Sequence, residues 1–254
     1  MFKATDLQGV RLAAMDGPIG EVEDLFFDDE LWTVRYLVVN TGGWLSGRHV
    51  LISPASVQQV DIANGRVIVI LTRQQVQESP DVDAHQPISR RLESALLLHY
   101  GLAPYWLGPM AWGAVPLPVP PDAGSPVEQA TLARQEADES EDAHLHSARD
   151  VIGYDIHARD GAIGQVEDFL VDDGPWTIRW VVVDTGNWLP GKRVLVSPEW
   201  VEAVTWSDRA VRVGLTRDQI EHAPEYKPDE PLSREYEVRL FEYYGRPSYW
   251  RDAA

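Results

Sequence analysis

The chain contains no cysteine among its 254 residues. This absence excludes disulfide bonds, thiolate zinc sites, iron–sulfur clusters and a cysteine nucleophile. Long apolar runs are missing as well, since no stretch approaches the roughly 20 apolar residues of a membrane-spanning helix. The first residues lack the basic and apolar regions of a signal peptide. We therefore expect a cytoplasmic protein without a membrane span.

Basic residues are scarce relative to acidic ones. The sequence has 22 lysines and arginines against 40 aspartates and glutamates, which gives a formal net charge of −18. Phosphate recognition depends on clustered lysine and arginine side chains, so this balance argues against nucleic acid as a partner. The hydrophobic share of 44% is typical of a folded globular protein.

The sequence contains an internal repeat, because one domain-sized unit occurs twice. Residues 17–54 align with residues 161–198 at a constant offset of 144 without a gap, and 22 of the 38 positions are identical. The same offset relates shorter matches further along, up to the Tyr-Trp pairs at 105–106 and 249–250. The repeats are too long for a solenoid, so the pattern indicates a tandem duplication of a small domain.

These matches predict three segments. Repeat one with its C-terminal helix covers 1–106, a Pro-rich acidic linker covers 107–146, and repeat two with its C-terminal helix covers 147–254. The linker begins with a proline-rich stretch, 115–121, that favours an extended polyproline conformation. We interpret the linker as solvated, with a helix near 126–137 as the alternative.

Within each repeat the periodicity is mainly that of β-strands. In repeat one, alternating and β-branched residues predict strands at 10–14, 19–27, 32–39, 50–52, 57–62 and 66–71. Thr72 is placed to cap one helical turn, and Ser89 to cap a longer helix that ends at Gly101; Ser233 and Gly245 delimit its counterpart. Short strands with two open edges are prone to aggregate, so we predict two small closed antiparallel β-barrels, each followed by a short C-terminal helix.

The order and spacing of these motifs resemble the PRC-barrel domain family. The resemblance is carried by G-x-I-G-x-V-E-D, a D-D turn, V-V-x-T-G and G-[RK]-x-V-L-[IV]-S-P, followed by L-T-R-x-Q, S-R, Y-G and Y-W, in both repeats. The family includes the cytoplasmic domain of the photosynthetic reaction centre H subunit and the C-terminal barrel of a ribosome-maturation factor. In both relatives the barrel is an adaptor without catalytic residues. The resemblance implies the fold and a binding role.

No catalytic or metal-binding residues recur in the two repeats. None of the seven histidines has a histidine at the equivalent position, so we predict neither a duplicated histidine–metal site nor a Ser-His-Asp triad. Four acidic positions do recur, Glu23, Asp24, Asp28 and Asp29, but neighbouring strand residues point to opposite faces. We interpret these carboxylates as solvated turn and edge charges, and the recurring arginines at 35 and 179 as solvated surface charges, with pairing to nearby carboxylates as the alternative for the arginines.

The most informative loops pair tryptophan with leucine between glycines. They place Trp44 and Leu45 in repeat one and Trp188 and Leu189 in repeat two. Either each tryptophan folds back to cap its own barrel, or the pair is an apolar anchor for a protein partner, because tryptophan is enriched at binding hot spots. The loops are alternatively used between the repeats, in a pseudo-dimer, or in a homo-oligomer.

The sequence therefore predicts a non-enzymatic scaffolding protein that docks on other macromolecules through protein surfaces. It needs no cofactor, and its protein partner is unknown. The alternative is a small-molecule- or metal-binding regulator that uses a cleft between the two barrels.

Overall fold

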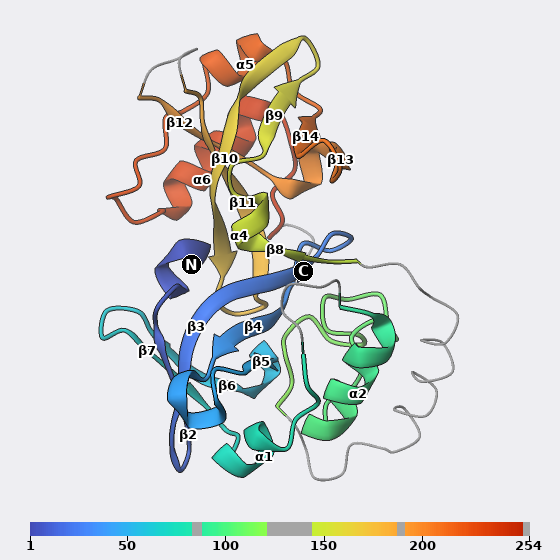
Figure 1. Cartoon of the computed structure of the whole chain (residues 1–254). Helices are drawn as coiled ribbons and strands as arrows, with labels where there is room; N and C mark the ends of the chain where they lie inside the picture. The colour runs from blue at the N-terminus through green and yellow to red at the C-terminus, as the bar shows by residue number, and fades with distance from the viewer. Residues whose placement is uncertain (83–87, 121–143, 187–190, 251–254) are drawn as a thin grey trace. The chain divides into compact units, whose positions relative to one another are not determined.

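The chain forms two compact units in the computed structural model, which describes residues 1–82, 88–120, 144–186 and 191–250 (Figure 1). The N-terminal unit comprises Phe2–Asp150 and, from the second repeat, Val171–Ile178. The C-terminal unit comprises Val151–Leu170 and Arg179–Ala254, with Met1. No helix in the described ranges has the length and apolarity needed to cross a membrane.

The first sheet has seven strands in the described residues. Their order is β5-β4-β3-β2-β7-β6, and β8 pairs with β3 outside this path. The strands are β2 (Arg11–Ala14), β3 (Gly17–Asp28), β4 (Val34–Asn40), β5 (His49–Ile52), β6 (Val57–Asp61), β7 (Arg66–Val69) and β8 (Leu145–Ser147). Helices α1 (Arg73–Gln77) and α2 (Arg90–Tyr100) follow β7, and α4 (Ala148–Val151) follows β8.

The second sheet repeats this order at the same offset. Its path is β12-β11-β10-β9-β14-β13, and β1 pairs with β10 outside it. The strands are β1 (Phe2–Lys3), β9 (Asp155–Ala158), β10 (Gly161–Asp172), β11 (Thr177–Asp184), β12 (Arg193–Val196), β13 (Val201–Thr205) and β14 (Ala210–Val213). Helices α5 (Arg217–Glu221) and α6 (Arg234–Tyr244) follow β14.

The prediction of two closed antiparallel barrels is wrong. Neither seven-stranded sheet closes, because the paths end at β5 and β6 and at β12 and β13. The sheets are also mixed, since β2 runs parallel to β7 and β14 runs parallel to β9. The expected mainly β fold and the short C-terminal helices are present.

The connection between β5 and β6 explains why the sheet stays open. Pro54–Ser56 forms a 3-10 turn whose first residue has no N–H, and the Ser53 hydroxyl accepts the Ala55 N–H at 3.3 Å. The chain therefore changes direction before β6 instead of extending a ladder beside β5. Closure is not needed to prevent pairing between molecules at the sheet edges, because the edge strands β5 and β6 have only four and five residues.

The helix boundaries follow their predicted caps. The Thr72 hydroxyl accepts the Gln75 N–H at 3.2 Å, which starts α1, and Ser89 accepts the Leu92 N–H at 3.3 Å, which starts α2. Gly101 ends α2 with φ of 68°, a left-handed conformation that favours glycine. Ser233 and Gly245 delimit α6 in the same way.

The N-terminal unit includes two segments that follow the first repeat: β8, at the junction of the linker and the second repeat, and the β10–β11 turn of the second repeat. Strand β8 adds to β3, with Phe27 opposite His146. The β10–β11 turn contacts the β3–β4 turn through two backbone hydrogen bonds, Val34 N–H to Trp176 O at 2.8 Å and Ile178 N–H to Trp32 O at 2.7 Å. Each bond relates to the other by the offset of 144, so the two turns pair reciprocally.

Candidate functional site

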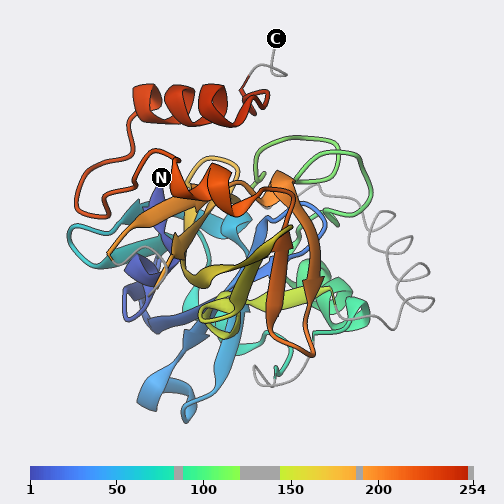
Figure 2. The same cartoon turned by 90° about the horizontal axis from the view of Figure 1, so that it is seen from above.

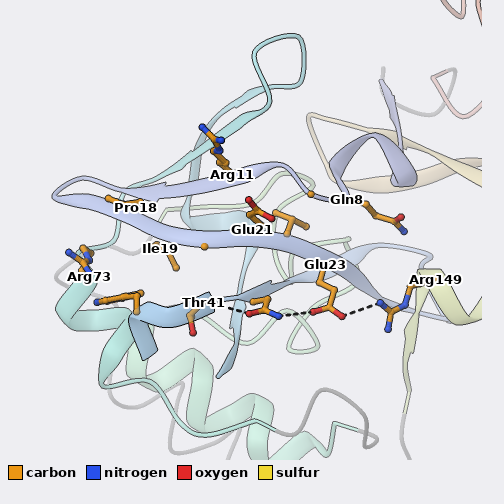
Figure 3. A pocket seen from close by; sticks show the side chains of 15 residues that line it. Gln8, Arg11, Pro18, Ile19, Glu21, Glu23, Thr41, Arg73 and Arg149 are labelled. Carbon is orange, nitrogen blue, oxygen red and sulfur yellow. Dashed lines mark hydrogen bonds and ion pairs between the residues drawn. The ribbon is translucent and has the colours of Figure 1, made fainter. Parts of the chain in front are cut away.

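A groove of about 920 Å³ runs along β3 in the N-terminal unit. Its floor is β3, and its sides are β2 and the segment that follows β4 (Figure 3). Arg73, at the start of α1, lies at one end, and Arg149, on α4, lies at the other. We call this feature the β3 groove.

The turn that carries Trp44 borders the β3 groove. Gly42–Leu45 forms a 3-10 turn after β4, and Figures 1 and 2 show it in light blue at the far end of that strand. Gly42, Ser46 and Gly47 have φ values of 56°, 56° and 75°, which explains the glycines on both sides of the Trp-Leu pair. None of the four turn residues is buried, so the Trp44 ring does not enter the core.

Trp44 instead packs against an arginine. The Arg73 guanidinium carbon lies 4.3 Å from the centre of the Trp44 ring, which is within the range of a cation–π contact. Both side chains are half-buried and both line the groove. Leu45 is also half-exposed, whereas Trp188 and Leu189 lie outside the described residues.

Local backbone contacts hold Arg73 in place. Its N–H donates to the Asp16 carboxylate at 2.8 Å, which ties the start of α1 to the β2–β3 turn. At Gly17, a Cβ atom would lie 3.2 Å from the Arg73 Cδ, so the glycine leaves room for the side chain. The Arg73 Nε is buried and has no hydrogen-bond partner in the part of the chain that the structure describes.

Glu23 lies at the Arg149 end of the groove. Its Oε2 lies 2.8 Å from His49 Nε2, and its Oε1 accepts a hydrogen bond from Arg149 Nη1 at 3.2 Å. Asn40 Nδ2 donates to the same carboxylate at 3.4 Å. The hydrogen bond from His49 is the main reason that the pKa of Glu23 is lowered from its ordinary value. Glu23 is therefore an ionised acceptor at neutral pH.

Asp24 positions Arg149 from the opposite face of β3. Its carboxylate is buried and accepts hydrogen bonds from the Ser147 hydroxyl and from the Arg149 N–H, the latter at 3.1 Å. Burial raises the pKa of Asp24, although these hydrogen bonds oppose the effect. Asp24 thus anchors β8 and α4, and α4 presents Arg149 to the groove.

Two interpretations of charged residues from the sequence are wrong. Asp24 and Asp28 are buried, not solvated, and Arg35 is 2% exposed. Arg35 donates from Nε to Asp28 at 2.7 Å, donates to the Ala111 carbonyl, and stacks 3.7 Å from the centre of the Tyr105 ring. Strand alternation placed Arg35 outside, but residues of the 107–120 segment cover this face of β4.

The described residues contain no group of three or more histidine, aspartate or glutamate side chains that could hold a metal ion.

Near the groove, the Thr41 hydroxyl donates to the Arg48 carbonyl at 2.7 Å. The groove offers groups for the recognition of a ligand. At one end Trp44 lies against Arg73, and at the other end Glu23 is paired with Arg149.

The PRC-barrel domain model matches residues 1–76 and 144–219, which together exceed half of the chain. The chain belongs to the PRC-barrel family. The chain is thus a tandem PRC-barrel protein, and no curated protein matches it. Each matched segment contains one full copy of the strand order described above.

Sequence reasoning missed most of the residues that surround Trp44. Arg73 recurs as Arg217 within the L-T-R motif, and this recurrence was the available signal. Arg149 could not be found in this way, because its equivalent at the offset of 144 is Thr5. Its place in the groove depends on the pairing of β8 with β3, which no local pattern indicates.

Proposed function

We propose that this PRC-barrel protein is a non-enzymatic scaffold that docks on other proteins through the β3 groove. The observation that supports the proposal is the half-exposed Trp44–Arg73 stack at the end of that groove. Tryptophan and arginine are the side chains most enriched at energetic hot spots of protein interfaces. We propose in addition that the protein acts in the cytoplasm. Its net charge of −18 disfavours the binding of nucleic acid.

Site-specific photo-cross-linking tests docking at this surface. The full chain carries benzoylphenylalanine at position 45, beside Trp44, or at position 98, where Leu98 is 46% exposed on α2 away from the groove. We expect a discrete protein adduct in cells from position 45 and none from position 98. The adduct should disappear in the Trp44→Ala variant, with folding checked by circular dichroism. Equal adducts from both positions, or an adduct that persists in the Trp44→Ala variant, would contradict docking through the groove.

The second hypothesis, a small-molecule- or metal-binding regulator, is favoured by one observation. The groove volume of about 920 Å³ lies within the usual range for small-molecule sites. This groove lies within one unit, whereas the sequence hypothesis placed the ligand in a cleft between repeats. Calorimetric titration with divalent cations and common metabolites checks the hypothesis, which requires saturable heat that Trp44→Ala removes.

A further inference from the structure

We propose that the partner segment of the β3 groove is an extended acidic peptide, with a carboxylate side chain bound by Arg73 and apolar side chains along β3. This inference rests on the proposed docking function and specifies the chemistry of the partner. The groove follows β3 from Pro18 to Glu23, which binds Arg149. At about 3.3 Å per strand residue this length is about 17 Å, which fits roughly six extended residues.

Arg73 is the group that selects a carboxylate. Its guanidinium stacks on Trp44, and its Nε is buried and has no hydrogen-bond partner in the described ranges, so a docking partner has to meet the two terminal nitrogens of this half-buried side chain. Stacking uses the face of the guanidinium and leaves the N–H groups at its edge for an acceptor. A carboxylate satisfies several of these donors at once, because the fork of arginine matches its two oxygens.

The contacts of Arg73 contrast with those of other arginines in the same unit. Acidic residues outnumber basic ones 40 to 22, so arginines have many acids within reach. Four other arginines of this unit bind a carboxylate: Arg35 to Asp28 at 2.7 Å, Arg48 to Asp81 at 3.0 Å, Arg90 to Glu93 at 3.4 Å and Arg149 to Glu23 at 3.2 Å. Arg73 binds the Asp16 carboxylate through its backbone N–H.

The two ends of the groove differ, which decides at which end the acidic side chain of the peptide binds. At the Arg149 end, Glu23 already neutralises the arginine at 3.2 Å. At the Trp44 end the described residues place no such carboxylate on the Arg73 side chain, and the exposed Pro18 supplies apolar surface on β3 (Figure 3). The acidic residue of the peptide therefore belongs at the Trp44 end.

The cationic character is specific to the groove of repeat one. Arg11, Arg73 and Arg149 line it together with Glu21 and Glu23, which leaves a formal surplus of one positive charge. The equivalent positions at the offset of 144 are Asp155, Arg217, Thr5, Gln165 and Glu167, which leave one negative charge in excess. The net charge of −18 repels acidic partners only weakly beyond the Debye length, which is about 8 Å at physiological ionic strength. Contacts made inside the groove are shorter than this distance, so the nearest charge, that of Arg73 at the Trp44 end, decides the interaction there.

Selection from a random heptapeptide phage library on the immobilised full chain tests the inference. We expect the wild type to enrich peptides with one aspartate or glutamate next to apolar residues. The best peptide and its version with the acid replaced by the amide are then synthesised, and their Kd values are measured by fluorescence anisotropy. Arg73→Gln should weaken binding of the acidic peptide about tenfold or more and leave the amide version unchanged.

Arg91→Gln, an exposed arginine of α2 outside the groove, is the matched control and should change neither Kd. Arg73→Lys should lie between wild type and Arg73→Gln, because it keeps the charge without the fork. Circular dichroism and thermal unfolding confirm that all variants fold.

Enrichment of peptides without an acidic residue, or an acidic peptide that binds Arg73→Gln as tightly as wild type, would overturn the inference. If such neutral peptides still lose binding in Trp44→Ala, docking through the groove stands and only the acidic chemistry fails. Enrichment of no peptide would count against both.

Discussion

Arg35 is buried together with the carboxylate that it binds. Arg35→Ala should lower the free energy of unfolding by about 3–5 kcal/mol, because it leaves the buried Asp28 carboxylate without its cation. Arg179→Ala, at the equivalent position, should cost less, since that side chain is half-buried and solvent reaches its charge; it lies 4.2 Å from the centre of the Tyr249 ring. Urea unfolding measures the free energy of unfolding that each variant loses. Equal losses would contradict the prediction that the buried Arg35–Asp28 pair makes Arg35 the more important residue for stability.

Glu23 should contribute stability that depends on pH. Its pKa is lowered in the folded protein from the ordinary value of 4.5, chiefly by the hydrogen bond from His49. A lowered carboxyl pKa stabilises the folded state fully above the unfolded pKa, and the contribution is lost as pH falls through the folded pKa. Wild type should therefore have a higher Tm than Glu23→Gln at pH 7, and the difference should shrink progressively as pH falls below about 4.5.

The buried Asp24 has the opposite sign, because burial raises its pKa from 3.8 and acidification relieves that penalty. Thermal unfolding of wild type and Glu23→Gln between about pH 3.5 and pH 7 measures the Glu23 contribution alone, since Asp24 is common to both proteins. A difference in Tm that stays constant over this range would contradict the assignment.

At the scale of elements, each C-terminal helix carries a buried glutamate that binds residues outside the helix. On α6, Glu237 accepts hydrogen bonds from Trp180 Nε1 at 3.0 Å and from the Tyr249 hydroxyl at 2.9 Å. On α2, the equivalent Glu93 accepts from Tyr105 at 2.6 Å and lies 2.8 Å from His144 Nε2. In both units, therefore, a carboxylate joins the helix to residues from elsewhere in the chain.

Removing the Glu237 carboxylate should loosen α6. Glu237→Ala takes the acceptor from Trp180 and Tyr249 and the carboxylate from Arg234, which lies 3.0 Å away, and we expect a loss of about 2 kcal/mol in the free energy of unfolding. Glu237→Gln keeps one acceptor oxygen and should lose less. Glu242→Ala, an exposed position in the last turn, should change stability by under about 0.5 kcal/mol. Urea unfolding followed by tryptophan fluorescence makes the comparison, and a loss for Glu237→Ala no larger than that for Glu242→Ala would contradict it.

Elements whose signals are local could be predicted from the sequence, and elements that depend on distant contacts could not. Thr72, Ser89 and Gly101 carry their capping chemistry within a few residues, so α1 and α2 were placed correctly. The parallel pairing of β2 with β7 joins segments more than fifty residues apart, and periodicity contains no information about it. Arg35 and Glu93 were misjudged or missed for the same reason, because the residues that bury them come from other segments.

The residues of the candidate site could also be predicted from the sequence only where their signal is local. Trp44 was predicted from its glycine-bounded loop, and Arg73 recurs in the L-T-R motif that carried the family resemblance. The contact between them was not predictable, because it requires the β2–β3 turn to hold α1 through Asp16. The tests of the groove therefore address residues that only the fold brings together.

At the scale of the whole molecule, the second repeat supplies part of the unit that contains the first. Trp176 lies at the β10–β11 turn, is 3% exposed, and belongs to the N-terminal unit. Its ring contacts Phe2 with centres 5.5 Å apart, and its carbonyl accepts the Val34 N–H at 2.8 Å. The Thr33 and Thr177 hydroxyls lie 3.3 Å apart beside this bond. The β3–β4 pair should therefore depend on a residue that lies more than 140 positions away in the sequence.

Hydrogen exchange tests this dependence directly, because it reports the local opening of individual segments. Trp176→Ala should increase amide exchange in peptides that cover residues 25–40, since it removes a buried ring beside the start of β4. Trp206→Ala, a half-buried tryptophan of the second repeat that contacts Tyr154 instead, should leave those peptides unchanged. If Trp176→Ala alters exchange only within 151–170 and 179–250, the β10–β11 turn is a passive neighbour of β4. Increased exchange at 25–40 would mean that duplication has made the first PRC-barrel sheet dependent on the second copy for its own stability.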